Sequence, residues 1–328
     1  MPLTEEAITT MNANTEKAVV LGAGIMGHGV AQLLAENGIE VYLVDQNQEA
    51  LDRARGWIGD NLEYMVQLGE LPADRPGQVL GRVHLTTELV PALSGAGYVL
   101  EAVTEDLAVK HQVWELLSQH APASAILASN TSSYDINELT QDVVGPERVL
   151  CTHWFHPPQI TPCVEVIPSA RTGAATVEWI LAFLTSLGKV PTLCRSAPGF
   201  VANRIQLAMA REAIALVEEG LATPAEIDRI VKTSFGFRLS AFGPFEIIDQ
   251  AGADTYCKVY EYLYSKLPRE QFRPPELLRK QVEARRLGLK SSAGFYDYGP
   301  GAADAMRRDR DRKLYARLKL VRPEWDDR

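Results

Sequence analysis

The sequence predicts an α/β fold, in which a doubly wound parallel sheet is followed by a smaller all-α domain. Between residues 17 and 194, short apolar runs alternate with helical patterns, which is typical of strands joined by crossover helices. After a break at 196–199 the pattern changes, and apolar residues recur at helical spacing. We therefore predict a flexible tail at 1–15, a nucleotide-binding type of domain at 16–196 and an all-helical domain at 197–328.

The elements of the first domain follow from the alternation of these patterns. Short apolar runs predict strands at residues 17–21, 39–44, 83–85, 98–103, 125–129, 149–155, 164–167 and 190–194. Helices are predicted at residues 25–37, 48–68, 107–120 and 176–187. Residues 71–81 contain two prolines and two glycines, so we predict a loop there.

The helical domain is predicted from periodicity and from one helix-start signal. Apolar side chains recur at helical spacing at Ile205, Met209, Ala213, Leu216 and Val217. Thr223 and Glu226 form a capping box with Pro224 at the first helical position, so a new helix is expected to begin there. Further helices are predicted at residues 256–265, 275–286 and 302–320.

Composition narrows the class of protein. The chain has 328 residues, a formal net charge of −9 and a pI of about 5.3, which argue against non-specific binding to nucleic acid or anionic membranes. No apolar run approaches the roughly 18 residues of a membrane helix, and the polar stretch 1–15 does not resemble a secretory signal. The four cysteines are scattered, so we expect reduced thiols and a cytoplasmic location.

A glycine-rich turn joins the first predicted strand to the first helix, with the spacing Gly22-x-Gly24-x-x-Gly27. Gly22 permits the tight turn, Gly24 lets a pyrophosphate approach the backbone, and Gly27 lets helix and strand pack closely. The helix N-terminus offers N–H groups and partial positive charge to phosphates. Asp45 ends the next strand, where an acid can bind the ribose hydroxyls of NAD, and no arginine follows it for the 2′-phosphate of NADP. The prediction is a Rossmann-type NAD site comprising Gly22, Ala23, Gly24, Ile25, Met26, Gly27 and Asp45. A glycine-rich turn without function is the alternative.

Two residues near the ends of late strands suggest acid–base chemistry. Ligands bind at the carboxyl ends of strands in open α/β sheets, and His153 lies near the end of one such strand. Hydride transfer to NAD requires a base for the alcohol proton, and a histidine held by a carboxylate suits this role. Taken alone, His153 is more typical of a structural histidine in the core or in a loop than of a catalytic one. Glu165 is more informative because it lies inside the apolar run 164–167, and a buried carboxylate needs a partner.

Several motifs occur together in an order and spacing that are shared with a known family. They are the glycine turn; Glu101-Ala102 with Glu105 and Lys110; Asn130-Thr131-Ser132-Ser133; His153 to Pro157 followed by Val164-Glu165-Val166; Pro198-Gly199-Phe200 with Asn203-Arg204; and Lys290-Ser291 followed by Gly294-Phe295-Tyr296-Asp297-Tyr298. On these motifs, which extend over roughly residues 17 to 298, the chain resembles the 3-hydroxyacyl-CoA dehydrogenase family.

The resemblance implies roles for individual residues. It implies that His153 is the catalytic acid/base with Glu165 as its partner, and that Ser132 and Asn203 hold the substrate oxygen. It also implies that Glu105, Lys110 and Asn130 lie along the cofactor, and that the helical domain forms a homodimer. The structural alternatives are a helix-capping role for Asn203, a turn-forming role for Ser132 and a solvated helix charge for Lys110.

The chain departs from the family at the position of His156, where the family usually has asparagine. The nearby Pro158 and the 160–162 run resemble the branch that acts on free 3-hydroxy acids, which includes L-gulonate 3-dehydrogenase and lambda-crystallin. The segment around Arg238 also resembles that branch. A guanidinium can bind a carboxylate through two charge-assisted hydrogen bonds, and a CoA thioester has no free carboxylate near its reacting carbon. We therefore predict a small L-3-hydroxy carboxylic acid as substrate, with Arg238 as its clamp and His156 in its pocket; a surface salt bridge is the alternative for Arg238.

Two further functions stay open on the sequence. One is oxidation of an L-3-hydroxyacyl-CoA such as 3-hydroxybutyryl-CoA, although the predicted helix 48–68 has Arg53 and Arg55 and lacks the lysine of CoA-using relatives. The other is NAD binding without turnover, in the manner of a lens crystallin. His153 and His156 have H-x-x-H spacing, but the neighbouring prolines disrupt helical geometry, so no metal site is predicted.

Overall fold

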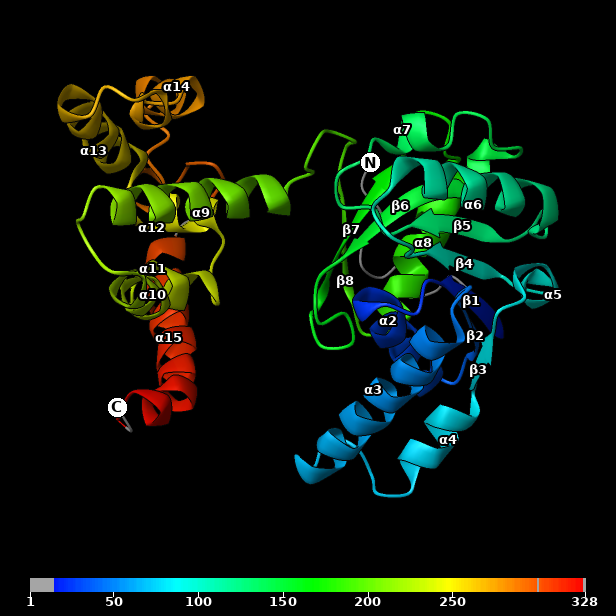
Figure 1. Ribbon diagram of the computed structural model, residues 1–328. Coiled ribbons are helices and arrows are strands. Elements are labelled where there is room, and N and C mark those ends of the chain that lie inside the picture. The colour runs from blue at the N-terminus through cyan, green and yellow to red at the C-terminus, as the bar shows by residue number, and fades with distance from the viewer. Residues whose placement is uncertain (1–14, 300, 327–328) are drawn as a thin grey trace. The chain divides into compact units, whose positions relative to one another are not determined.

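The computed structural model describes residues 15–299 and 301–326, which belong to two compact units (Figure 1). The first unit ends at Ala208 and the second begins at Met209. The predicted flexible tail at 1–15 lies outside the described residues, except for Thr15. Both predicted fold classes are confirmed, since the first unit is built around a sheet and the second from helices.

The first unit contains an eight-stranded sheet with the order β3-β2-β1-β4-β5-β6-β7-β8. Its strands are β1 (Lys17–Leu21), β2 (Glu40–Val44), β3 (Val83–Thr86), β4 (Tyr98–Glu101), β5 (Ile126–Ser129), β6 (Val149–Trp154), β7 (Cys163–Pro168) and β8 (Val190–Leu193). Neighbouring strands are parallel except β6 and β7, which pair antiparallel. The order reverses beside β1, so the carboxyl ends of β1 and β4 border the crevice in which ligands of such sheets bind.

Helices cover both faces of the sheet. They are α2 (Ile25–Glu36), α3 (Gln48–Gln67), α4 (Arg75–Gly81), α5 (Leu89–Leu93), α6 (Leu107–His120), α7 (Ile136–Leu139) and α8 (Ala174–Ser186). One buried cluster joins the sheet to α2, α3, α4 and α8, and a second joins it to α5, α6 and α7. Successive residues of β1 alternate between the clusters, with Val19 in the second and Val20 in the first, because side chains of a strand point to opposite faces.

Three features of the first unit differ from the sequence-based prediction. The prediction of a loop at 71–81 is wrong from Arg75 onward, because residues 75–81 form α4. Pro76 lies in the first turn of this helix, where its missing N–H has no helical partner to lose. The short helices α5 and α7 were not predicted. The sheet is not entirely parallel, because only residues 155–162 connect β6 to β7 and no crossover helix lies between them.

The second unit is helical. Helix α9 (Ala202–Glu218) begins in the first unit, and it is followed by α10 (Pro224–Thr233), α11 (Phe235–Leu239), α12 (Pro244–Ala251), α13 (Ala253–Lys266), α14 (Glu276–Glu283) and α15 (Ala302–Asp326). The capping box of Thr223 and Glu226 is present at the start of α10. Asp249 of α12 is 1% exposed, and its carboxylate accepts hydrogen bonds from the N–H groups of Phe295 and Tyr296 and from the hydroxyl of Tyr298. The Gly-Phe-Tyr-Asp-Tyr motif therefore stabilises this unit.

Two further expectations from the sequence concern the cysteines and membrane-spanning helices. All four cysteines are free thiols. Within the described ranges, no helix combines the length and the apolar character that crossing a membrane would require.

Candidate active site

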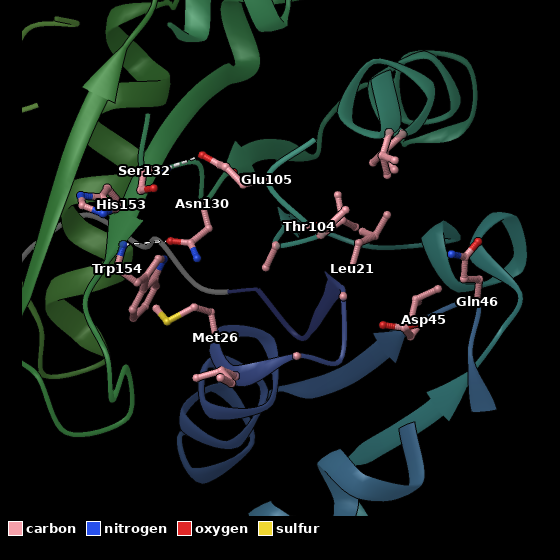
Figure 2. A pocket seen from close by; sticks show the side chains of 18 of the residues that line it. Leu21, Met26, Asp45, Gln46, Thr104, Glu105, Asn130, Ser132, His153 and Trp154 are labelled. Atoms are coloured by element: carbon pink, nitrogen blue, oxygen red, sulfur yellow. Dashed lines mark hydrogen bonds between the residues drawn. The ribbon is translucent and has the colours of Figure 1, made fainter. Parts of the chain in front are cut away.

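A cavity of about 910 Å³ lies at the carboxyl ends of the strands in the first unit (Figure 2). Figure 2 shows His153 and Ser132 at one end of this cavity, and Asp45 and Gln46 at the other end. The predicted site residues that line it are Gly22, Gly24, Ile25, Met26, Asp45, Glu105, Asn130, Ser132, His153, His156 and Asn203. The cavity is therefore long enough to bring the glycine turn and the candidate base into one site.

The glycine turn has the properties that a phosphate-binding loop requires. Gly22 has φ of +100°, and a Cβ there would lie 2.4 Å from the carbonyl oxygen of Ala102. A Cβ on Gly27 would lie 1.7 Å from the carbonyl oxygen of Gly22, so the turn and α2 can pack this closely only without a side chain. At Gly24, by contrast, a Cβ would meet no described atom within 4 Å. Gly24 is the N-cap of α2, whose first turn contains no acidic residue, so this open space suits an anion.

Asp45 is fixed at the end of β2 beside the glycine turn. Its two carboxylate oxygens accept hydrogen bonds from the N–H of Ala23 at 2.9 Å and from the N–H of Asn47 at 3.0 Å. A carboxylate oxygen can accept more than one hydrogen bond, so both oxygens retain capacity for ribose hydroxyls. Open space at Gly24 and an oriented acid at Asp45 fit NAD.

His153 and Glu165 form a buried hydrogen-bonded pair. They lie directly opposite each other in the antiparallel pair β6–β7, and Nδ1 of His153 is 2.7 Å from Oε2 of Glu165. The two residues are 5% and 3% exposed. Because an ionised carboxylate can only accept, Nδ1 carries the proton, which leaves Nε2 as the nitrogen that can accept one.

The other oxygen of Glu165 is bound at the start of α9. Oε1 accepts hydrogen bonds from the N–H groups of Val201 at 3.1 Å and Ala202 at 2.9 Å. Phe200, which precedes them, has φ of +48°, is 2% exposed and packs its ring 5.4 Å from that of His153. The ring of Phe155 lies 4.6 Å away from the same imidazole. These contacts stabilise the glutamate charge and keep water from the pair.

Three polar side chains line the cavity together with His153. The amide of Asn203 donates to the carbonyl oxygen of Ser132 at 3.2 Å. The amide oxygen of Asn130 accepts from the N–H of Trp154 at 3.0 Å, as Figure 2 shows. All three residues line the cavity, and backbone contacts fix the side chains of Asn130 and Asn203.

Glu105 holds the loop that carries Ser132. Its Oε1 accepts hydrogen bonds from the hydroxyl of Thr131 at 2.6 Å, the N–H of Ser132 at 3.0 Å and the hydroxyl of Ser133 at 2.9 Å. Burial acts to raise the pKa of Glu105. The hydrogen bond from Thr131, the charge of Lys110 and the hydrogen bond from Ser133 outweigh burial, so the pKa lies below its ordinary value. The carboxylate is therefore ionised at neutral pH.

Some predicted residues lie outside the cavity lining. Ala23, Gly27 and Glu165 support residues that do line it, while Lys110 is 1% exposed and pairs with Glu101 and Glu105. Arg238 belongs to α11 of the second unit, where it is exposed, and it is not among the residues that the first unit brings together.

Sequence reasoning missed His28 of α2, which lies one turn after Gly24 and is 8% exposed. Its Nδ1 is 2.9 Å from the carbonyl oxygen of Gly24. Burial lowers the pKa of His28; the hydrogen bond to Gly24 opposes this and the charge of His156 adds to it. His28 is therefore neutral at neutral pH and ties the first turn of α2 to its N-cap. Nothing in its spacing distinguishes it from a surface helix residue.

The sequence matches two family models. Residues 17–197 match the NAD binding domain of 3-hydroxyacyl-CoA dehydrogenase, and residues 199–298 match the C-terminal domain of the same enzyme. A probable 3-hydroxybutyryl-CoA dehydrogenase of Deinococcus radiodurans is 39% identical over 279 residues, which are 85% of this chain and 99% of that protein. A 5-formyl-3-hydroxy-2-methylpyridine 4-carboxylate 5-dehydrogenase of Mesorhizobium japonicum is 34% identical over 303 residues, which are 92% of this chain and 97% of that protein.

A solved structure is similar over both units. The 3-hydroxyacyl-CoA dehydrogenase of Archaeoglobus fulgidus aligns with a TM-score of 0.77 and 31% identity. The alignment covers 93% of this chain and 99% of that one.

Proposed function

This chain belongs to the 3-hydroxyacyl-CoA dehydrogenase family, and from that premise we propose that it oxidises the 3-hydroxyl of a small L-3-hydroxy carboxylic acid to the 3-oxo acid. It is an NAD-dependent dehydrogenase that acts on a CH–OH group. The observation that carries the proposed mechanism is the buried pair of His153 and Glu165 at one end of the cavity.

His153 acts as the base in this mechanism. Its Nε2 takes the proton from the substrate hydroxyl, while Glu165 keeps the proton on Nδ1 and stabilises the imidazolium that forms. NAD, when bound, accepts the hydride from C3 of the substrate. The two N–H groups of Val201 and Ala202 bind the other oxygen of Glu165 and hold the side chain in place through the whole cycle.

Ser132 and Asn203 hold the substrate oxygen on which charge develops. Both line the cavity together with His153, and both can donate a hydrogen bond from a side chain. On the cofactor side, the turn Gly22–Gly27 and Asp45 bind the pyrophosphate and ribose, and Glu105 and Asn130 line the stretch toward His153.

Two features favour a free carboxylic acid as the substrate. Helix α3 contains Arg53 and Arg55 on its exposed side but no lysine, and Pro158 with the 160–162 run resembles the branch that acts on free 3-hydroxy acids. In addition, a relative covered along nearly its whole length is named for a substrate with a free 4-carboxylate. Arg238 is exposed and its side chain makes no ion pair with a described residue, so it is available to bind such a group. The assignment to the branch of L-gulonate 3-dehydrogenase and lambda-crystallin stays a prediction.

A second candidate is 3-hydroxybutyryl-CoA dehydrogenase activity. The observation that favours it is the 39% identity to a probable 3-hydroxybutyryl-CoA dehydrogenase over 99% of that protein. The proposed roles of His153, Glu165, Ser132 and Asn203 are the same for both substrates.

A substrate panel separates the two candidates. The purified protein is assayed for NAD reduction with L-gulonate and 3-hydroxybutyrate, and for NADH oxidation with acetoacetyl-CoA. We expect a higher kcat/KM with a free hydroxy acid. Robust turnover of the thioester alone would refute the substrate assignment and leave the base chemistry standing.

The clamp is tested with Arg238→Ala, with Arg229→Ala of α10 as an exposed control. We expect a rise in KM of about tenfold or more for a hydroxy acid, because a charge-assisted bidentate contact is lost, and no rise for its methyl ester. Equal changes in KM for acid and ester would contradict the clamp.

We also propose that the helical part predicted at 197–328 forms a homodimer. None of the 17 residues of α9 is buried, although Ile205, Leu207 and Ile214 are large apolar residues that are at least 60% exposed. A helix of this kind normally packs against another surface. Light scattering at micromolar concentration is expected to give the mass of a dimer, and a monomeric mass would contradict this proposal.

A further inference from the structure

Lys110 is buried and does not itself line the cavity, although Glu105 and Val109 do. It is 1% exposed, and its ammonium lies between two carboxylates, 2.7 Å from Glu101 and 3.1 Å from Glu105. We propose that Glu101 and Lys110 are positioning residues, which fix Glu105 and through it the loop that carries Ser132. This inference rests on the proposed dehydrogenase function, and the prediction that Lys110 lies along the cofactor stays beside it.

Glu101 anchors Lys110 from the end of β4. The carboxylate is fully buried, and Oε1 accepts from Lys110 and from the N–H of Val103 at 3.0 Å. Oε2 accepts from the hydroxyl of Ser129 at 2.6 Å, at the end of the neighbouring strand β5. A buried carboxylate with contacts on both oxygens has one fixed position, and this position determines where the ammonium lies.

Lys110 in turn restrains Glu105. Glu105 lies on the segment between β4 and α6, and its side chain is 36% exposed, so burial alone does not fix it. Lys110 binds its Oε2, which leaves Oε1 directed at the three donors of Thr131, Ser132 and Ser133. Without the ammonium, two carboxylates would face each other and Glu105 would move toward solvent.

A second path leads from Glu101 to the same loop. The hydroxyl of Ser129, which donates to Glu101, also accepts a hydrogen bond from the N–H of Thr131 at 3.1 Å. The backbone N–H of Asn130 donates to the carbonyl oxygen of Glu101 at 2.7 Å. The loop between Asn130 and Ser133 is therefore held from Glu101 directly and through Lys110 and Glu105.

A double-mutant cycle separates positioning from stability. Lys110→Met leaves the buried carboxylate of Glu101 without its cation, and Glu101→Gln leaves the buried ammonium of Lys110 with Glu105 as its one carboxylate partner among the described residues, so both single variants should lower the melting temperature. The double variant removes both charges and should regain most of the melting temperature. Its kcat should nevertheless stay on the order of 10–100-fold below that of the unmodified enzyme, because Glu105 has lost its restraint and Ser132 is misplaced.

Two further measurements do not depend on turnover. Hydrogen exchange of the amides at residues 131–134 should be faster in the double variant, since the N–H of Ser132 donates to Glu105. Binding of ADP, which lacks the second ribose and is expected to reach only the glycine turn and Asp45, should be unchanged. Glu115→Gln, at an exposed position of the same helix, serves as the control.

The outcomes distinguish this inference from the proposed function. Recovery of both melting temperature and kcat in the double variant, or unchanged exchange at 131–134, would show that the ion pair only stabilises the fold and would overturn the inference. Absence of turnover in the unmodified enzyme would count against the proposed function, while the exchange measurement would still decide the role of Glu101 and Lys110.

Discussion

Replacement of Glu165 by glutamine tests the mechanism most directly, because it keeps the size of the side chain and removes one acceptor. The carboxylate accepts from three donors: Nδ1–H of His153 on Oε2, and the N–H groups of Val201 and Ala202 on Oε1. A glutamine amide has one acceptor oxygen and one NH₂ group, so it cannot satisfy both sides while the proton of His153 stays on Nδ1.

The two possible orientations of the amide differ in free energy. If its oxygen faces His153, the NH₂ group confronts the N–H groups of Val201 and Ala202, and each buried donor left unpaired costs about 1–3 kcal/mol. If its oxygen faces α9, the NH₂ group confronts Nδ1 of His153, which becomes an acceptor once its proton moves to Nε2. The second orientation leaves no donor unpaired, so we expect it to be adopted.

The consequence of that orientation is loss of the base. With the proton on Nε2, His153 can no longer accept the proton of the substrate hydroxyl. A comparable change of histidine tautomer in a hydrolase triad lowers kcat by about 10⁴-fold. We therefore expect kcat of Glu165→Gln to fall by about 10³–10⁴-fold, which corresponds to about 4–5 kcal/mol in the activation free energy.

The assay is steady-state NAD reduction with the best substrate of the panel, together with a titration of NAD binding. The dissociation constant of NAD should change little, because Glu165 does not line the cavity. Glu115→Gln provides an exposed control. A Glu165→Gln enzyme that retains kcat within tenfold of the unmodified enzyme would refute the assignment of His153 and Glu165 as the acid–base pair.

The remaining predictions concern the glycine turn and the stability at low pH. Gly24→Ala should fold with an unchanged melting temperature but bind NAD at least tenfold more weakly, whereas Gly27→Ala should unfold at a lower temperature because its Cβ would overlap the carbonyl oxygen of Gly22. Equal melting temperatures for the two variants would contradict this. Glu105 has a pKa below its ordinary value of 4.5, so its stabilising contribution is present above that value and is lost as pH falls through the lower pKa of the folded state. The difference in melting temperature between the unmodified protein and Glu105→Gln should therefore shrink between about pH 6 and pH 3, and a difference that is constant with pH would contradict it.

The sequence was sufficient for the parts of the site that depend on local pattern. The spacing of Gly22, Gly24 and Gly27 has a direct steric reason, which the distances around Gly22 and Gly27 make visible. Glu165 was identified because a carboxylate inside an apolar run needs a partner, and the structure supplies His153 directly opposite it.

Glu101 also ends an apolar strand and is also fully buried, so its carboxylate needs a partner as that of Glu165 does. The sequence does not identify this partner. Lys110 has the pattern of a single charge on an amphipathic helix, and only the tertiary packing places it in the interior. The contact between Glu165 and α9 is of the same kind, because it joins backbone groups that have no residue-specific signal.

The antiparallel ladder between β6 and β7 separates the placement of the base from the shape of the cavity wall. Its register fixes the distance between His153 and Glu165, whereas the connecting residues 155–162 carry His156 at the cavity wall. Substitutions or insertions in that connection can reshape the wall without moving the hydrogen-bonded pair, provided that the ladder hydrogen bonds persist. A shift of one residue in the ladder would instead turn one of the two side chains to the opposite face. New substrate preferences can therefore arise in this scaffold through successive variants that all retain a working base.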